Sequence, residues 1–158
     1  MAGQTGFDLE INRILNTPVS LVWKAWIVKE NLEEWWCPKP WRAEFTAFDP
    51  RPGGAFDTIM RGPDGEKHVY AGSFLEVAPM ERIVFTGLFG ENWRPLPDES
   101  GMGFAAIITM TAQGDQTRYS ALVRHASAEG VKKHEEMGFH DGWGAAIDQL
   151  EALAASLS

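Results

Sequence analysis

The sequence predicts an α+β fold in which one curved antiparallel sheet packs against a long C-terminal helix. Three observations lead to this class. Apolar residues alternate over residues 7–15 and in several segments between residues 42 and 125, as in half-buried strands. Apolar residues recur at helical spacing in two short segments near the N-terminus and again over residues 127–157. Packing the last helix on the concave face of the sheet buries the apolar sides of both.

The size and charge of the chain limit what it can be. Its 158 residues correspond to one domain, residues 1–158, at about 100–200 residues per domain. Asp and Glu number 22 against 14 Lys and Arg, so the formal net charge is -8. An acidic chain repels phosphate backbones, so we expect no nucleic-acid partner. The single cysteine, Cys37, allows no internal disulfide and no cysteine-based metal site.

The sequence also argues against a membrane partner, a bound metal and a cofactor. No segment reaches the ~18 apolar residues that cross a bilayer, and the N-terminus lacks the features of a signal peptide. We therefore expect a cytoplasmic protein with no membrane partner. The four histidines show no spacing typical of a metal site, so we predict neither a metal nor another cofactor.

The N-terminal third should form a strand and two helices. Residues 7–15 form the strand. Thr17 is expected to cap the first helix, whose first turn holds Pro18. A second short helix is predicted over residues 29–36, and Pro38 helps to end it.

The middle of the chain reads as about six strands joined by turns and loops. Gly-Pro-Asp-Gly at residues 62–65 and Gly-Asp at residues 114–115 are typical of hairpin turns. A long loop rich in Pro, Gly and charge is expected over residues 89–103. The predicted strands span residues 43–48, 55–61, 68–77, 82–88, 104–112 and 116–125.

The closing segment, residues 127–157, is predicted as one long helix. Ser127 should cap it, although Gly130 stands where Glu or Gln would complete a capping box. Its apolar stripe begins at Phe139, and Met137 and His140 lie beside the N-terminal half of that stripe.

The element order and several local motifs together resemble the helix-grip fold of the START and birch-pollen-allergen superfamily. The closer resemblance is to its branch of Hsp90 ATPase activator homologues, in the SRPBCC group. The matching stretches are TPVSLVWKAW at residues 17–26, EWWCP at 34–38, RPGG at 51–54, MRGPDG at 60–65, and MGFHDGW at 137–143 followed by DQL at 148–150.

This resemblance implies a cavity between the sheet and the last helix. Members of the superfamily bind lipids, hormones and polyketides, and some are cyclases or dehydratases. In the eukaryotic activator, the resembling region is only the C-terminal domain. The N-terminal domain associated with chaperone stimulation has no counterpart in this chain, which argues against chaperone activation.

Seven tryptophans are many for a core of this size. Trp23, Trp26 and Trp143 occupy helix positions that would pack in the core. Trp35, Trp36 and Trp41 flank the junction that the resemblance places at the cavity mouth, and Trp93 lies in the long loop, where it is expected to act as a lid. The full set of predicted ligand-binding residues is Trp35, Trp36, Trp41, Phe56, Thr58, Met60, Trp93, Tyr119, His125, Met137 and His140.

Two histidines are candidates for polar chemistry at the cavity wall. His125 shares a strand face with Tyr119, and His140 lies beside the helix stripe. Either imidazole can orient a ligand or act as a general base, and the alternative is a buried histidine paired with the backbone. His68 and His134 are expected to be exposed and without a role. Cys37 is expected to be a packed, inert thiol.

Three functions follow, in order of preference. The first is binding of a small hydrophobic or aromatic ligand without a catalytic role. The second is a polyketide cyclase or dehydratase with His140 as the base. The third is a co-chaperone-like or stress-related protein-binding module, or a homodimer, formed through an exposed patch that includes Trp41 and Trp93.

Overall fold

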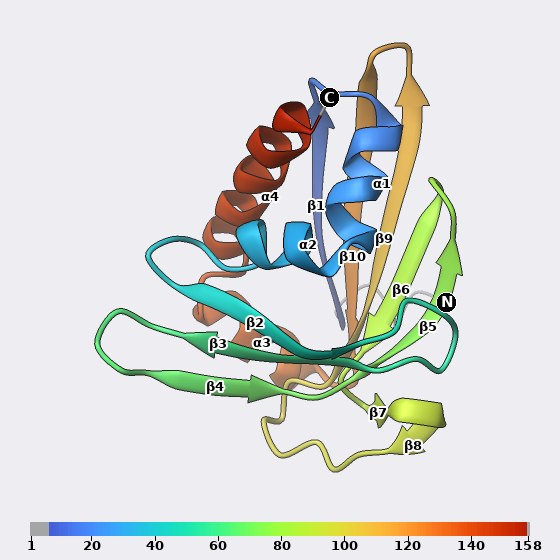
Figure 1. Cartoon of the computed structure of the whole chain (residues 1–158). Coiled ribbons are helices and arrows are strands. Elements are labelled where there is room, and N and C mark those ends of the chain that lie inside the picture. Colours follow the sequence, from blue (N-terminus) through green and yellow to red (C-terminus); the bar gives the residue numbers. More distant parts are fainter. Residues whose placement is uncertain (1–6, 158) are drawn as a thin grey trace.

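The computed structural model describes residues 7–157 and contains a five-stranded and a three-stranded antiparallel sheet (Figure 1). The strand orders are β1-β10-β9-β6-β5 and β2-β3-β4. The first sheet consists of β1 (Asp8–Leu15), β10 (Gln116–His125), β9 (Phe104–Gln113), β6 (Arg82–Thr86) and β5 (Ser73–Ala78), and the second of β2 (Arg42–Phe48), β3 (Phe56–Arg61) and β4 (Lys67–Tyr70).

The two sheets meet at one corner. Ala55 and Ser73 form an isolated antiparallel bridge, and the Phe56 N–H donates to the Gly72 carbonyl at 3.0 Å. The strands of the smaller sheet then run across those of the larger one (Figure 1). This continuous backbone pairing gives the curved antiparallel surface that the sequence predicts.

One predicted strand is wrong, because the chain bends at this corner. Residues 68–77 were expected to be continuous, but the chain leaves β4 after Tyr70 and enters β5 at Ser73 in the other sheet. Gly72 makes this passage possible, because a Cβ there would lie 2.3 Å from the Thr86 carbonyl oxygen. The bend is a tertiary effect that alternation of apolar residues does not record.

Four α-helices cover the concave side of this surface. They are α1 (Val19–Ile27), α2 (Lys29–Trp35), α3 (Ala128–Glu136) and α4 (Phe139–Ser156). In Figure 1, α4 lies alongside α1 and α2, above the strands of the smaller sheet. None of the helices in residues 7–157 is long and apolar enough to cross a membrane.

The predicted single C-terminal helix is wrong, because it is two helices. Gly138 breaks it with a left-handed conformation, φ 89°, which costs glycine little and an L-residue roughly 1–2 kcal/mol. The predicted cap at Ser127 is confirmed, since its hydroxyl accepts a hydrogen bond from the Gly130 N–H at 3.0 Å.

The predicted cap at Thr17 is also wrong. Pro18 occupies the N-cap position of α1, and no side chain caps this helix. Thr17 is buried instead, and its carbonyl accepts a 2.8 Å hydrogen bond from the Thr117 hydroxyl of β10. Its backbone thereby fixes the start of α1 to the sheet.

The segment expected as a loop over residues 89–103 carries a small hairpin. It contains β7 (Phe89–Gly90), the short 3-10 helix η2 (Glu91–Trp93) and β8 (Arg94–Pro95). Trp93 has a positive φ of 61° and lies against Gly53, whose added Cβ would stand 2.8 Å from the indole ring.

Two glycines of the C-terminal segment should respond oppositely to the same substitution. Gly138→Ala forces a Cβ into a left-handed residue and should lower the free energy of unfolding by about 1 kcal/mol. Gly142→Ala lies inside α4, where an added Cβ meets no atom within 4 Å, and should raise it by about 0.5–1 kcal/mol. Urea unfolding of both variants checks this, and a shift in the same direction for both would contradict the assigned backbone.

Candidate functional site

A cavity of about 860 Å³ lies between α4 and the curved sheet. Its volume falls in the range of about 300–1,000 Å³ typical of small-molecule sites. Every layer of the fold contributes to its wall: Trp26, Trp35, Trp36, Cys37 and Pro38 from α1, α2 and the following turn; Met60, His68, Val69, Tyr70, Ala71, Phe85, Gly87, Phe104, Ile108 and Tyr119 from the strands and their ends; residues 96–100, 102 and 103 from the loop before β9; and His134, Met137, Gly142, Trp143, Ala146 and Ile147 from α3, α4 and their junction.

One end of the cavity is a tryptophan cluster. The Trp36 ring packs edge-on at 5.5 Å from Trp26 and 5.6 Å from Phe85. Trp26 is 1 % exposed, and its indole N–H donates a 2.9 Å hydrogen bond to the Tyr119 hydroxyl. Trp35 donates its indole N–H to the Ala25 carbonyl at 3.0 Å. These bonds satisfy the polar atoms of Trp26 and Trp35 within the protein, so this end offers a ligand chiefly aromatic surface.

The other end combines aromatic rings with a histidine. Phe104 lies between Tyr70 and His134, with ring centroids 6.5 Å and 5.2 Å away and both pairs nearly parallel. Trp143 from α4 packs edge-on to His134 at 6.1 Å. The Tyr70 hydroxyl is enclosed and has no hydrogen-bond partner among the described residues. Burial raises the pKa of Tyr70, so the phenol stays protonated at neutral pH.

His134 and His125 form a hydrogen-bonded pair. His125 Nε2 lies 2.9 Å from His134 Nδ1, and His125 Nδ1 lies 3.2 Å from the Phe7 carbonyl oxygen. Burial, with the neighbouring His125 as a smaller cause, lowers the pKa of His134 from 6.5 to about 4. His134 is therefore neutral at physiological pH, and it is the imidazole of the pair that reaches the cavity.

This arrangement corrects two expectations about histidines. His134 was expected to be exposed, but it is only 8 % exposed. His140 was expected beside the stripe and near the cavity, but it is exposed and does not line the cavity. The break at Gly138 explains both differences. His134 lies in α3 and faces inward against β10. His140 lies in α4, whose orientation is independent of α3, so the spacing of one continuous helix does not apply to it. Gly138 itself, as a glycine that ends a helix, is the signal that could have predicted this.

Five of the eleven predicted ligand-binding residues line the cavity. They come from four separate parts of the chain, which only the fold brings together: Trp35, Trp36, Met60, Tyr119 and Met137. Their contact with a ligand remains a prediction.

The other six predicted residues lie elsewhere. Phe56 is buried behind the wall and stacks on Phe85 at 4.5 Å. The Thr58 hydroxyl, also buried, donates to the Glu44 carbonyl at 2.9 Å. Trp41 stacks on the cavity residue His68 at 5.6 Å from outside the wall. The remaining three are Trp93, which packs on Gly53, His125, which lies behind His134, and the exposed His140.

The sequence also missed residues that line the cavity. Tyr70 and Phe104 were read as ordinary strand residues, but both line the cavity. Tyr70 lies at the end of β4, where the chain turns from one sheet to the other, and Phe104 is the first residue of β9. Ile147 was assigned only to the apolar stripe of the C-terminal helix, and Ala146 was not singled out. Their small and aliphatic side chains form the α4 wall.

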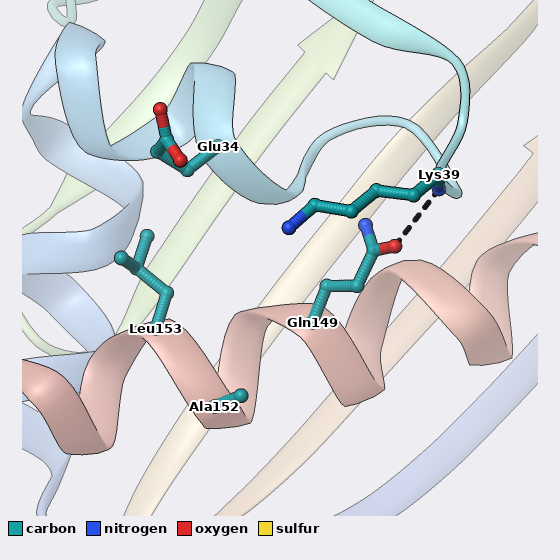
Figure 2. Close-up of a pocket in the computed structure, with 5 residues that line it drawn as sticks. All are labelled: Glu34, Lys39, Gln149, Ala152 and Leu153. Carbon is teal, nitrogen blue, oxygen red and sulfur yellow. Dashed lines mark hydrogen bonds between the residues drawn. The ribbon is translucent and has the colours of Figure 1, made fainter.

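A second, smaller pocket of about 250 Å³ lies between α2 and α4 (Figure 2). Gln149 is one of its lining residues, and its side-chain amide is hydrogen-bonded within the protein. Its side-chain oxygen accepts from the Lys39 N–H at 2.9 Å, and its nitrogen donates to the Trp35 and Cys37 carbonyls at 3.2 Å and 2.7 Å. These bonds tie the turn after α2 to α4, so we assign this pocket a structural role.

Cys37 lies at the tryptophan end of the larger cavity. It is 5 % exposed, and burial raises the pKa of its thiol to about 11. The thiol is therefore almost wholly protonated at neutral pH. Within residues 7–157, no group of three or more His, Cys, Asp or Glu side chains is arranged to hold a metal ion.

Comparison with known proteins places the chain in a family. The family described as "Activator of Hsp90 ATPase homolog 1-like protein" matches residues 16–155. No curated protein matches the chain.

Solved structures of bacterial proteins share the fold. A crystal structure from Nitrosomonas europaea has 39 % sequence identity and a TM-score of 0.90, and the match covers 96 % of both chains. A solution structure from Arthrobacter aurescens has 25 % identity and a TM-score of 0.84, over 97 % of this chain and 88 % of that one. An AHSA1 protein from Silicibacter pomeroyi, at 20 % identity and a TM-score of 0.69 over 96 % and 99 %, shares the fold. The predicted helix-grip fold and its branch are thus confirmed.

The histidine pair should make stability depend on pH. The folded-state pKa of His134 lies near 4 and its ordinary value is 6.5, so between these values the unfolded chain takes up a proton that the folded chain does not. Stability should therefore fall as the pH drops from 6.5 to 4, by up to about 3 kcal/mol from this residue. Urea unfolding across this window should show a shallower slope for His134→Phe and an unchanged slope for the exposed control His140→Phe. An equal slope in all three proteins would contradict the assignment.

Cys37 should react slowly with thiol reagents. A thiol pKa near 11 instead of 9 leaves about 100-fold less thiolate at pH 8 than in an exposed cysteine, and burial adds to this protection. Labelling with a disulfide reagent should be at least about 100-fold slower in the folded protein than in urea. Equal rates would show that the thiol is accessible.

Proposed function

Because the chain belongs to the family of Activator of Hsp90 ATPase homolog 1-like proteins, we propose that it binds a small hydrophobic or aromatic molecule in the cavity under α4. Family and fold support a role in ligand binding or as a binding module. The observation that carries the finer proposal is the cavity of about 860 Å³ with a wall rich in aromatic and aliphatic side chains. A cytoplasmic location belongs to this proposal.

The composition of the wall favours a hydrophobic ligand. Burial of apolar surface contributes about 25 cal/mol per Å² before the costs of association. The Trp36 and Phe85 rings at one end and the Phe104 and Trp143 rings at the other offer two aromatic surfaces. Ile108 and Ile147 add aliphatic wall. A ligand long enough to reach both aromatic ends gains the most from this shape.

Binding is favoured over catalysis. The polyketide cyclase alternative relied on His140 as a base, and this residue is exposed and outside the cavity. Two histidines do line the cavity: His68, which is exposed, and the buried His134, which has a pKa near 4. A base with so low a pKa is a weak proton acceptor in a reaction at neutral pH.

A protein-binding role has one supporting observation. Val69 and Met137 line the cavity and are also 70 % and 67 % exposed, which adds apolar surface at its rim. Of the two tryptophans expected in an interaction patch, Trp41 stacks on His68, and Trp93 lies against Gly53 but is 52 % exposed. A homodimer or a chaperone-related partner therefore remains the second proposal.

Blocking the cavity tests ligand binding. An added Cβ at Gly142, which lines the cavity, meets no atom within 4 Å, so Gly142→Phe should place a ring in open cavity space. Titration with pyrene, followed by energy transfer from the tryptophans, should show saturable binding to the unmodified protein. Gly142→Phe should weaken it about tenfold or more, since tenfold corresponds to about 1.4 kcal/mol.

Ala155→Phe is the matched control, because Ala155 is exposed on the same helix and does not line the cavity. Its pyrene affinity should equal that of the unmodified protein. Absence of saturable pyrene binding, or equal binding by the Gly142→Phe variant, would reject the cavity as a ligand site.

A further inference from the structure

The tautomers of the histidine pair can be assigned from their partners. A carbonyl oxygen only accepts hydrogen bonds, so His125 Nδ1, which lies 3.2 Å from the Phe7 carbonyl, carries a proton. In a neutral imidazole the other nitrogen is then an acceptor. His125 Nε2 therefore accepts from His134 Nδ1 at 2.9 Å. It follows that the proton of neutral His134 is on Nδ1 and that His134 Nε2 carries a lone pair.

This lone pair is available to a ligand. His134 is 8 % exposed and lines the cavity. Within residues 7–157, its Nε2 has no hydrogen-bond partner, yet it is not among the fully enclosed polar atoms. Its remaining access is therefore toward the cavity. A ligand that fills the cavity covers this acceptor, and a ligand that donates a hydrogen bond to it avoids leaving the nitrogen buried without a partner.

The charges around the cavity select against an anion. Its charged lining residues are Asp98 and Glu99, and no Lys or Arg is among the described residues that line it. Lys133, the neighbour of His134 in the sequence, is exposed and donates to the Ser100 carbonyl at 2.6 Å. A carboxylate next to the His134 lone pair would be buried without a counter-ion, and this is costly.

We propose that the ligand is an uncharged hydrophobic molecule with a hydroxyl group, and that this hydroxyl donates a hydrogen bond to His134 Nε2 while the hydrophobic body lies toward the tryptophan cluster. This inference rests on the proposed function, because it specifies the ligand class of the same cavity. His125 is a positioning residue in it, since it fixes the tautomer of His134 without touching the ligand.

Four pyrene probes test the inference at neutral pH: 1-hydroxypyrene, 1-methoxypyrene, pyrene and 1-pyrenecarboxylate. They share one hydrophobic body and differ in the group offered to His134. We expect 1-hydroxypyrene to bind about five- to tenfold more tightly than 1-methoxypyrene, as one additional hydrogen bond implies. The carboxylate should bind most weakly.

The variant His134→Asn measures the contribution of the His134 Nε2 lone pair to binding. The asparagine amide can still donate to His125 Nε2, but it is too short to replace His134 Nε2. In this variant the preference for 1-hydroxypyrene over 1-methoxypyrene should fall to about one, and this ratio is the readout because any change in the wall affects both probes alike. His140→Asn is the matched control and should keep the full preference. If His134→Asn does not fold, His134→Phe, which preserves the ring stacked on Phe104, should give the same loss.

The outcomes separate the inference from the function on which it rests. Equal binding of hydroxy- and methoxypyrene by the unmodified protein, or a preference that survives in both His134 variants, overturns the hydrogen bond and leaves the cavity as a hydrophobic site. Tightest binding of the carboxylate overturns the choice of an uncharged ligand. Absence of binding by all four probes rejects the ligand site itself.

Discussion

The hydrogen bond between the Trp26 indole and the Tyr119 hydroxyl is the contact around which the fold and the cavity are arranged. It joins α1 to strand β10 at 2.9 Å, inside a region where both side chains are almost fully buried. A buried indole N–H needs an acceptor, and Tyr119 supplies one at a fixed point of the sheet. The position of α1 then sets Trp36 against Phe85 through the aromatic cluster.

The space that the cavity occupies depends on two interruptions of regular structure. At Gly72 the chain passes from one sheet to the other, which carries Tyr70 to the wall and leaves the smaller sheet crossing the larger one. At Gly138 the C-terminal segment divides, so that α3 closes one end of the cavity and α4 forms its long wall. Both positions require glycine, the first because a carbonyl approaches closely and the second because φ is positive.

The two ends of the cavity differ in polarity. At the tryptophan end, Trp26, Trp35 and Tyr119 satisfy one another or the backbone, so the surface left for a ligand is mainly apolar. At the histidine end, one imidazole nitrogen and one phenol have no partner among the described residues. A few polar groups in a largely apolar site fix the orientation of a ligand and provide its specificity.

The sequence by itself determined the element types, the hairpin turns at residues 62–65 and 114–115 and the inward face of β10, because these depend on local periodicity and turn chemistry. It also indicated the family and the helix-grip fold, which the comparisons confirm. It identified Trp35, Trp36, Met60, Tyr119 and Met137 as candidate residues that the fold then brings to the cavity. Only the tertiary structure decided that His134 lines the cavity while His140 does not, and that Phe56 and Thr58 lie behind its wall. The physical reason is that a break in a helix or a bend in a sheet changes which face a residue presents, while the residue pattern on either side stays the same.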